Sequence, residues 1–320
     1  MEKLNFSLKI WTLLFACVCA VVVLLTWCSP FVSAEGVQPT PAEGVVGTLI
    51  DGVKLREGLV TSARGEYEHV LTSNKDPKVV EHVPPEVEKK RLARYAFRVK
   101  WAFAPDVFRE ETIILDSTKE GEPEISRSTI IQGYDGERGW YYEPATGYAM
   151  EASTREDCEA KGIVGDFGDW LGLGFIYGRG KPLSQVLLDS RATFVGTESL
   201  NGMECYKLTA PANETGAVYS WWIAPSLGYN LVKRTYQPSQ GAKRRAVFEY
   251  SYSLHDDVWF PERRIHTAFM TLDGVEYWVR KTEITSIAVQ IKPGLTREFF
   301  RPNYAVGTEV YTPDGVRKIE

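Results

Sequence analysis

The sequence has 320 residues, a formal net charge of −5, 44% hydrophobic residues and 25% charged residues, as is usual for a soluble globular protein. The acidic balance argues against a nucleic-acid partner, since such a protein needs basic side chains to hold the phosphates. Aromatic residues make up 12% of the chain. Most of them lie in alternating segments, which favours a sheet protein over a helical one.

Residues 1–34 have the pattern of a secretory signal. Lys3 and Lys9 precede an apolar run over residues 10–28, and the small residues of Val32-Ser33-Ala34 follow it, as at a cleavage site. The run is also long enough to span a bilayer, so an uncleaved anchor over residues 10–28 is the alternative. In both cases the lysines stay inside and the remainder is exported, to the periplasm or another outside compartment. Membrane contact is then expected through this segment or during cargo transfer.

The remainder is predicted to be a flexible leader and one domain. Residues 35–48 are rich in Gly, Pro and Ala, which predicts a loose leader. The domain is expected over residues 49–320, and its first residues form either a short helix or an irregular entry segment. An oxidising compartment permits a disulfide between Cys158 and Cys205; two separate thiols are the alternative.

Strands are predicted along most of the domain. The segment YAFRVKWAFA, residues 95–104, places five large apolar side chains on one face: Tyr95, Phe97, Val99, Trp101 and Phe103. Alternation in FEYSYSL, residues 248–254, groups Phe248, Tyr250 and Tyr252 in the same way. Turn signals at 135–136, 256–257 and 273–274 join neighbouring strands.

These strands predict the fold class. We expect a mainly β protein, with a single large curved antiparallel sheet forming a half-open β-barrel and a few short helices. Residues 153–190 interrupt the sheet with two short helical segments around a Gly-rich stretch. That stretch fails both phosphate-loop patterns and is interpreted as a flap or linker.

No catalytic or metal-binding pattern is present in the sequence. The four histidines are scattered, without metal-ligand spacing, and there is no nucleophile elbow. The adjacent carboxylates Asp256 and Asp257 fit a hairpin turn better than an acid–base pair. The sequence therefore predicts no enzyme, no metal and no cofactor.

The stretch YSWWIAPSLGYNLVKR, residues 219–234, contains two adjacent tryptophans. Neighbouring side chains of a strand point to opposite faces. We therefore expect this strand to be covered on both sides, with Trp221 and Trp222 on different faces.

Two motifs and their order carry a family resemblance. The first is Trp222-Ile-x-Pro-x-x-Gly228, and the second is Gly196-x-Glu-x-x-x-Gly202 leading into Tyr206. Over about residues 60–310, the chain resembles the LolA/LolB-like superfamily of periplasmic lipoprotein-sorting and lipid-binding proteins. The resemblance implies a half-open antiparallel β-barrel closed by short helices, with an apolar cavity that shelters acyl chains.

The predicted function is non-catalytic binding of lipid or lipoprotein acyl chains, as a carrier or chaperone of the cell envelope. Burying a chain of roughly 16 carbons contributes more than about 10 kcal/mol, which requires a lined apolar cavity. The predicted lining is Tyr95, Phe97, Val99, Trp101, Phe103, Trp222, Phe248, Tyr250 and Tyr252. The alternative is an envelope sensor or protein-interaction module on the same scaffold, with a filled core and an envelope protein as its partner.

Overall fold

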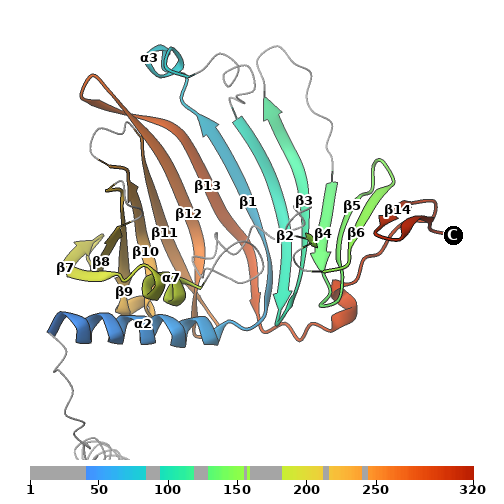
Figure 1. The fold of residues 1–320 in the computed structure, drawn as a ribbon, viewed down its shortest axis with the longest axis horizontal. Helices are drawn as coiled ribbons and strands as arrows, with labels where there is room; N and C mark the ends of the chain where they lie inside the picture. Colours follow the sequence, from blue (N-terminus) through green and yellow to red (C-terminus); the bar gives the residue numbers. More distant parts are fainter. Residues whose placement is uncertain are drawn as a thin grey trace, which may run out of the picture. The chain divides into compact units, whose positions relative to one another are not determined.

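One sheet of 15 strands dominates the computed structural model (Figure 1). The structure describes residues 41–83, 94–118, 129–154, 157–158, 182–211, 216–239 and 244–320. The predicted signal or anchor over residues 1–34 and the Gly-rich stretch lie outside the described residues.

The elements follow one another in a mainly β order. The helical elements are α2 (Pro41–Leu59), α3 (Pro77–Val80), α7 (Leu183–Asp189), η1 (Pro225–Leu227) and η2 (Arg297–Phe300). The strands are β1 (Ala63–Ser73), β2 (Arg94–Ala104), β3 (Val107–Thr118), β4 (Thr129–Tyr134), β5 (Gly139–Glu143), β6 (Tyr148–Ala152), β7 (Thr193–Leu200), β8 (Met203–Pro211), β9 (Val218–Ala224), β10 (Asn230–Gln237), β11 (Arg244–His255), β12 (Val258–Leu272), β13 (Val275–Ile291), β14 (Glu309–Thr312) and β15 (Gly315–Lys318).

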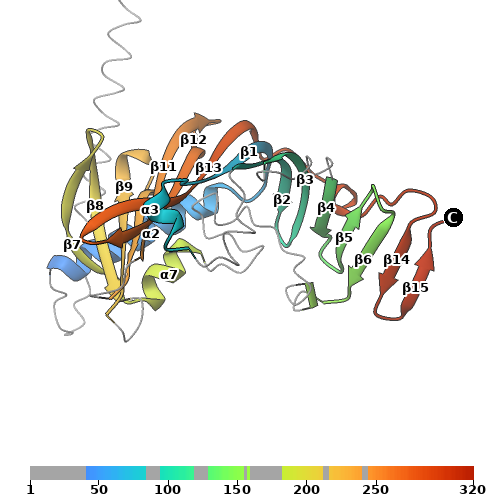
Figure 2. The same cartoon turned by 90° about the horizontal axis from the view of Figure 1, so that it is seen from above.

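The strand order across the sheet is β15-β14-β6-β5-β4-β3-β2-β1-β13-β12-β11-β10-β9-β8-β7. All neighbours are antiparallel except β14, which pairs with β6 in parallel. Strand β1 pairs with β13, so the first strand of the domain meets a strand from late in the chain in the middle of the sheet. Strands β15 and β7 form separate edges (Figure 2). The predicted single, curved, half-open and mainly antiparallel sheet is confirmed.

Two-residue turns set the register of the longest strands. Asp256 and Asp257 join β11 to β12 with φ values of 47° and 63°. Asp273 and Gly274 join β12 to β13 with φ values of 50° and 79°. Left-handed conformations at both central residues match the twist of a tight hairpin, so the predicted turns at these positions are confirmed.

Helix α2 begins earlier than the sequence indicates. Residues 41–48 lie in its first turns, which corrects the expected loose leader over that part of 35–48. The helix buries Leu49, Ile50 and Val53 in a cluster with Leu183 and Leu187 of α7. Figure 1 shows α7 beside α2, along one end of strands β7 to β11. No helix among the described residues is long and apolar enough to cross a membrane.

The two cysteines of the domain lie in separate clusters. Cys205 packs with Trp222 and Val232, whereas Cys158 packs with Ala152 at the end of β6. Both are free cysteines, so of the two alternatives the structure has two separate thiols rather than a disulfide. Each cysteine is instead buried as an apolar side chain in its own part of the fold.

Candidate functional site

The helices define an inner face of the sheet. Strands β8 to β11 place Leu208, Trp221, Leu231 and Tyr250 in one buried cluster with α2 and α7. Because side chains alternate along a strand, the residues between them belong to the opposite, outer face. We call the side that carries Trp221 the inner face throughout.

A pocket of about 850 Å³ lies on the inner face, between α7 and strands β9 to β11. We call it the inner pocket. Its lining includes the aromatic side chains Tyr219, Trp221, Tyr236 and Phe248, together with Arg234 and Asp189. The volume lies within the range of about 300–1,000 Å³ that is typical of small-ligand sites.

Phe248 is the centre of a ladder that crosses three strands. It pairs with Arg234 of β10 on one side and with His266 of β12 on the other. The Arg234 guanidinium carbon lies 4.1 Å from the Phe248 ring centroid. The His266 ring is stacked on the same phenyl ring, with centroids 4.1 Å apart and planes at 2°. The inner pocket therefore combines an aromatic lining with the guanidinium group of Arg234, which lies over the Phe248 ring.

Of the residues that the sequence predicts as cavity lining, Phe248 lies in the inner pocket. Val99, Trp101 and Phe103 are buried in a separate cluster of strands β1 to β3 and β12 to β13, and Phe97 packs against that cluster. Tyr95 adds a ring contact to Phe97, with centroids 5.4 Å apart. These five residues of β2 share a face, as expected, and they pack against one another and their neighbours. Trp101 also lines the second pocket, which is described below.

Tyr250 and Tyr252 lie with α2 rather than in the inner pocket. Tyr250 belongs to the cluster that α2 buries, and Tyr252 packs against it. The Tyr252 hydroxyl donates to the carbonyl oxygen of Leu231 at 2.7 Å. Burial raises the Tyr252 pKa, and burial lowers the pKa of nearby Arg56 to about 10. Arg56, Tyr250 and Tyr252 therefore belong to the buried contact between α2 and the sheet.

Trp222 lies on the outer face, so Trp221 and not Trp222 lines the inner pocket, which corrects the predicted lining. It packs with Cys205, Ala224 and Val232. Its indole nitrogen donates to Glu198 Oε2 at 2.7 Å. Hydrogen bonds from Lys207 and then Trp222 lower the pKa of Glu198. Trp222 thus anchors the outer surface of β9.

The sequence interpretation missed four residues of the inner pocket, namely Tyr219, Trp221, Arg234 and Tyr236. Alternation in YSW, residues 219–221, already places Tyr219 and Trp221 on one face. For Arg234 and Tyr236 the signal is the register of β10 with β9, where they pair with Trp221 and Tyr219.

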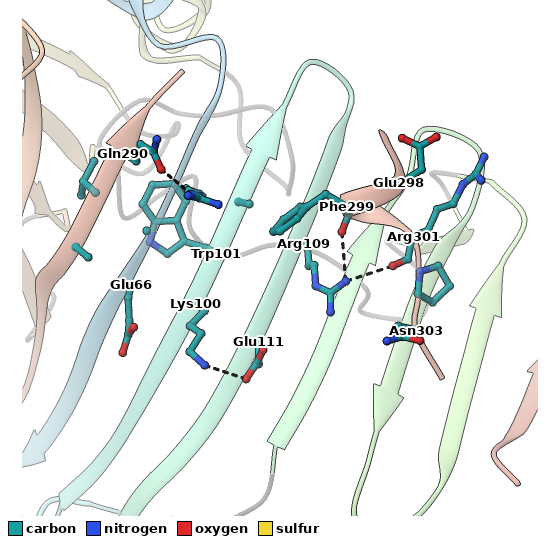
Figure 3. A pocket seen from close by; sticks show the side chains of 16 residues that line it. Glu66, Lys100, Trp101, Arg109, Glu111, Gln290, Glu298, Phe299, Arg301 and Asn303 are labelled. Carbon is teal, nitrogen blue, oxygen red and sulfur yellow. Dashed lines mark hydrogen bonds and ion pairs between the residues drawn. The ribbon is translucent and has the colours of Figure 1, made fainter. Parts of the chain in front are cut away.

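A second pocket, of about 930 Å³, involves the outer face of β1 to β3 and the segment that contains η2 (Figure 3). Arg109 donates to the carbonyl oxygens of Phe299 and Arg301 at 3.2 and 3.3 Å. Lys100 and Glu111 form an ion pair at 3.4 Å across its floor. Charged side chains of both signs surround this pocket, so it suits an acyl chain less well than the inner pocket.

Metal-site geometry is not found among the described residues. No group of three or more His, Cys, Asp or Glu side chains in this part of the chain is arranged to hold a metal ion. The inner pocket offers aromatic surface, with the guanidinium group of Arg234 and the carboxylate of Asp189 in its lining.

Comparison with known proteins gives distant structural likeness. No protein-family model matches the sequence, and no curated protein matches it. A domain from Vibrio parahaemolyticus, named for outer membrane lipoprotein sorting, has a TM-score of 0.43 and 14% identity, over 80% of this chain and 97% of that chain. A DUF1329 family protein from Desulfovibrio piger has a TM-score of 0.43 and 12% identity over the same shares. At these values neither likeness carries evidence of function.

Proposed function

We propose that this chain is an exported, non-catalytic protein that binds acyl chains of lipids or lipoproteins in the inner pocket, as a carrier or chaperone of the cell envelope. The observation that carries the proposal is the aromatic lining of that pocket by Tyr219, Trp221, Tyr236 and Phe248. The predicted secretory signal, or N-terminal anchor, in residues 1–34 supports the proposed location.

The physical basis is apolar burial. Each methylene group removed from water contributes about 0.8 kcal/mol, so a carrier must present a continuous apolar surface. Rings from three adjacent strands provide such a surface, and Val186 of α7 faces it. Aromatic side chains also present large area at little cost in conformational entropy.

A filling variant tests this site. Ala246 lines the inner pocket, so Ala246→Phe is expected to occupy its volume and weaken binding of a fluorescent C16 fatty acid by at least about tenfold. Thr235→Phe is the matched control, because Thr235 follows Arg234 on β10 and points to the outer face. Mass spectrometry of lipids extracted from the full-length protein is the companion measurement. Absence of both co-purified lipid and probe binding in the wild type would contradict the proposal.

The second candidate is a protein-interaction or sensor module with a filled core. The packing around Val99 and Phe103, both fully buried, favours it. The two candidates differ in the wild-type measurement: a module of this kind binds no acyl probe, and Ala246→Phe leaves its properties unchanged.

A further inference from the structure

We infer that the second pocket holds a phosphate group between Arg64 of β1 and Arg109 of β3, on the outer face of the sheet. The phosphate belongs to a lipid head group or is a free phosphate ion. This site is separate from the inner pocket, and the inference does not depend on the proposed function.

The two arginines flank one small side chain. Ala102 of β2 pairs with Arg64 on one side and with Arg109 on the other, so the three residues form one row across the outer face. Neighbouring strands lie about 4.8 Å apart, which places the Cα atoms of the two arginines roughly 10 Å apart. All three residues line the pocket. The methyl group of Ala102 therefore leaves space between two guanidinium groups, which a longer side chain would fill.

The next row of the same face carries two carboxylates, and each of them has a cationic partner within the protein. Glu111 forms an ion pair with Lys100 at 3.4 Å (Figure 3). Glu66 forms an ion pair with Arg98 at 3.3 Å. The negative charges on the floor of the pocket are therefore matched by side chains other than Arg64 and Arg109.

Neutral acceptors hold Arg64 and Arg109. The Arg64 Nε donates to Gln290 Oε1 at 2.8 Å, and the Arg109 Nη1 donates to two backbone carbonyl oxygens at 3.2 and 3.3 Å. Within the part of the chain that the structure describes, neither arginine forms an ion pair with a carboxylate. Burial lowers the pKa of Arg109, and the charge of Glu111 opposes this shift without cancelling it. A bound anion would stabilise the charged form of this partly buried group.

The remaining charged groups of the pocket belong to the η2 segment. Glu298 and Arg301 lie on that side of the pocket (Figure 3). Hydrogen bonds from its own backbone nitrogen and from the Thr296 side chain lower the pKa of Glu298, and the charges of Arg301 and Arg297 add to this. Four basic and three acidic side chains line the pocket, which gives the lining a formal charge of +1.

The arrangement suits a phosphate better than a carboxylate. A guanidinium group binds either anion through paired hydrogen bonds to two oxygens. One such contact occupies both oxygens of a carboxylate, whereas a phosphate keeps further oxygens for a guanidinium group on its other side. The volume of about 930 Å³ also admits a ligand larger than the ion itself.

A near-isosteric variant tests the site. Gln290→Glu keeps an acceptor for Arg64 and adds the negative charge that the phosphate supplies. The full-length protein is titrated calorimetrically at low ionic strength with inorganic phosphate and with dihexanoyl phosphatidic acid. Gln290→Glu is expected to weaken binding by at least about tenfold, the effect of one charge-assisted contact, and so is Arg64→Met. Gln237→Glu is the matched control, because it makes the same change of net charge at an exposed position of β10 outside the pocket.

The two probes distinguish the source of the phosphate. Tighter binding of phosphatidic acid identifies a lipid head group, and equal or weaker binding than inorganic phosphate identifies the free ion; both support the inference. Binding of neither probe overturns it, and so does equal weakening by Gln290→Glu and Gln237→Glu. Unchanged binding of phosphatidic acid by Gln290→Glu also overturns it. Loss of that binding in Ala246→Phe would then place the lipid in the inner pocket and leave the proposed function standing.

Discussion

Trp221 and Trp222 are adjacent in β9 yet lie in separate hydrophobic clusters on opposite faces of the sheet. Trp221 is covered by the helices and contributes to the inner pocket. Trp222 is held between Lys207 and Lys233, whose ammonium nitrogens lie 4.9 and 5.1 Å from its ring. The expectation that this strand is covered on both faces is confirmed, and the two faces are covered by different means.

Substitutions at the two tryptophans should therefore have different costs. Trp221 is 2% exposed, and Trp221→Ala is expected to lower the free energy of unfolding by about 3–5 kcal/mol through loss of packing. Trp222→Phe keeps a ring but loses the hydrogen bond to Glu198, with an expected loss of about 1 kcal/mol. Urea denaturation of the two variants measures both values. Equal losses would contradict the assignment of the two side chains to different environments.

Two glycines of α2 provide a matched test of how the helix meets the sheet. A Cβ atom at Gly52 would overlap the ring of Tyr229, whereas a Cβ atom at Gly47 would meet nothing within 4 Å. Gly52→Ala is expected to destabilise the protein by about 1–3 kcal/mol. Gly47→Ala is expected to stabilise it by about 0.5–1 kcal/mol, because alanine is the better helix former. Thermal unfolding of both variants checks the signs, and destabilisation by Gly47→Ala would show that this part of α2 is not as described.

The glycines of α2 also explain why the sequence did not predict its start. Gly44, Gly47 and Gly52 lower the helix propensity of residues 41–59, and the segment looks like a loose leader. Burial of Leu49, Ile50 and Val53 against the sheet compensates for that weakness. Local helix propensities do not include tertiary packing of this kind, so they do not predict the start of α2.

The strands and turns were predictable because alternation and turn residues are local signals. The parallel pairing of β14 with β6 was not, since it joins segments far apart in the chain. The inner pocket was missed for a different reason. The register of β10 shifts between Leu231 and Lys233, so plain alternation from Leu231 would turn Lys233 inward instead of Arg234. One extra residue in a strand reverses every later side chain.

The pKa of His69 predicts a pH dependence of stability. Its folded value of about 4 lies below the ordinary 6.5, so between these pH values the unfolded chain binds the proton more strongly. The contribution of His69 to stability is complete above pH 6.5 and is lost as the pH falls, by about 2 kcal/mol at pH 5. His69→Phe keeps a ring beside Phe97 and removes this titration.

The measurement is the free energy of unfolding of both proteins at pH 7.5 and pH 5. Other titrating groups are common to the two, so their effect cancels in the difference between the slopes. The wild type should lose more stability than His69→Phe on acidification. Identical losses would show that His69 is not the group responsible.

Besides the apolar packing of the two helices, one carboxylate of α2 accepts hydrogen bonds from α7, and we expect this contact to affect how firmly α7 covers the inner pocket. Glu57 accepts hydrogen bonds from the Ser184 hydroxyl at 2.6 Å and from the Ser184 backbone nitrogen at 3.1 Å. Ser184→Ala removes the first bond, at an expected cost of about 1–2 kcal/mol. Because Val186 and Asp189 of the same helix line the pocket, we expect faster amide exchange over residues 183–190 and faster dissociation of an acyl probe. Thr193→Ala, which removes a bond of 3.3 Å to the carbonyl oxygen of Thr209 and lies outside the lining of the inner pocket, is the control. Unchanged exchange in Ser184→Ala would show that apolar packing of Leu183 and Leu187, rather than Glu57, holds the helix in place.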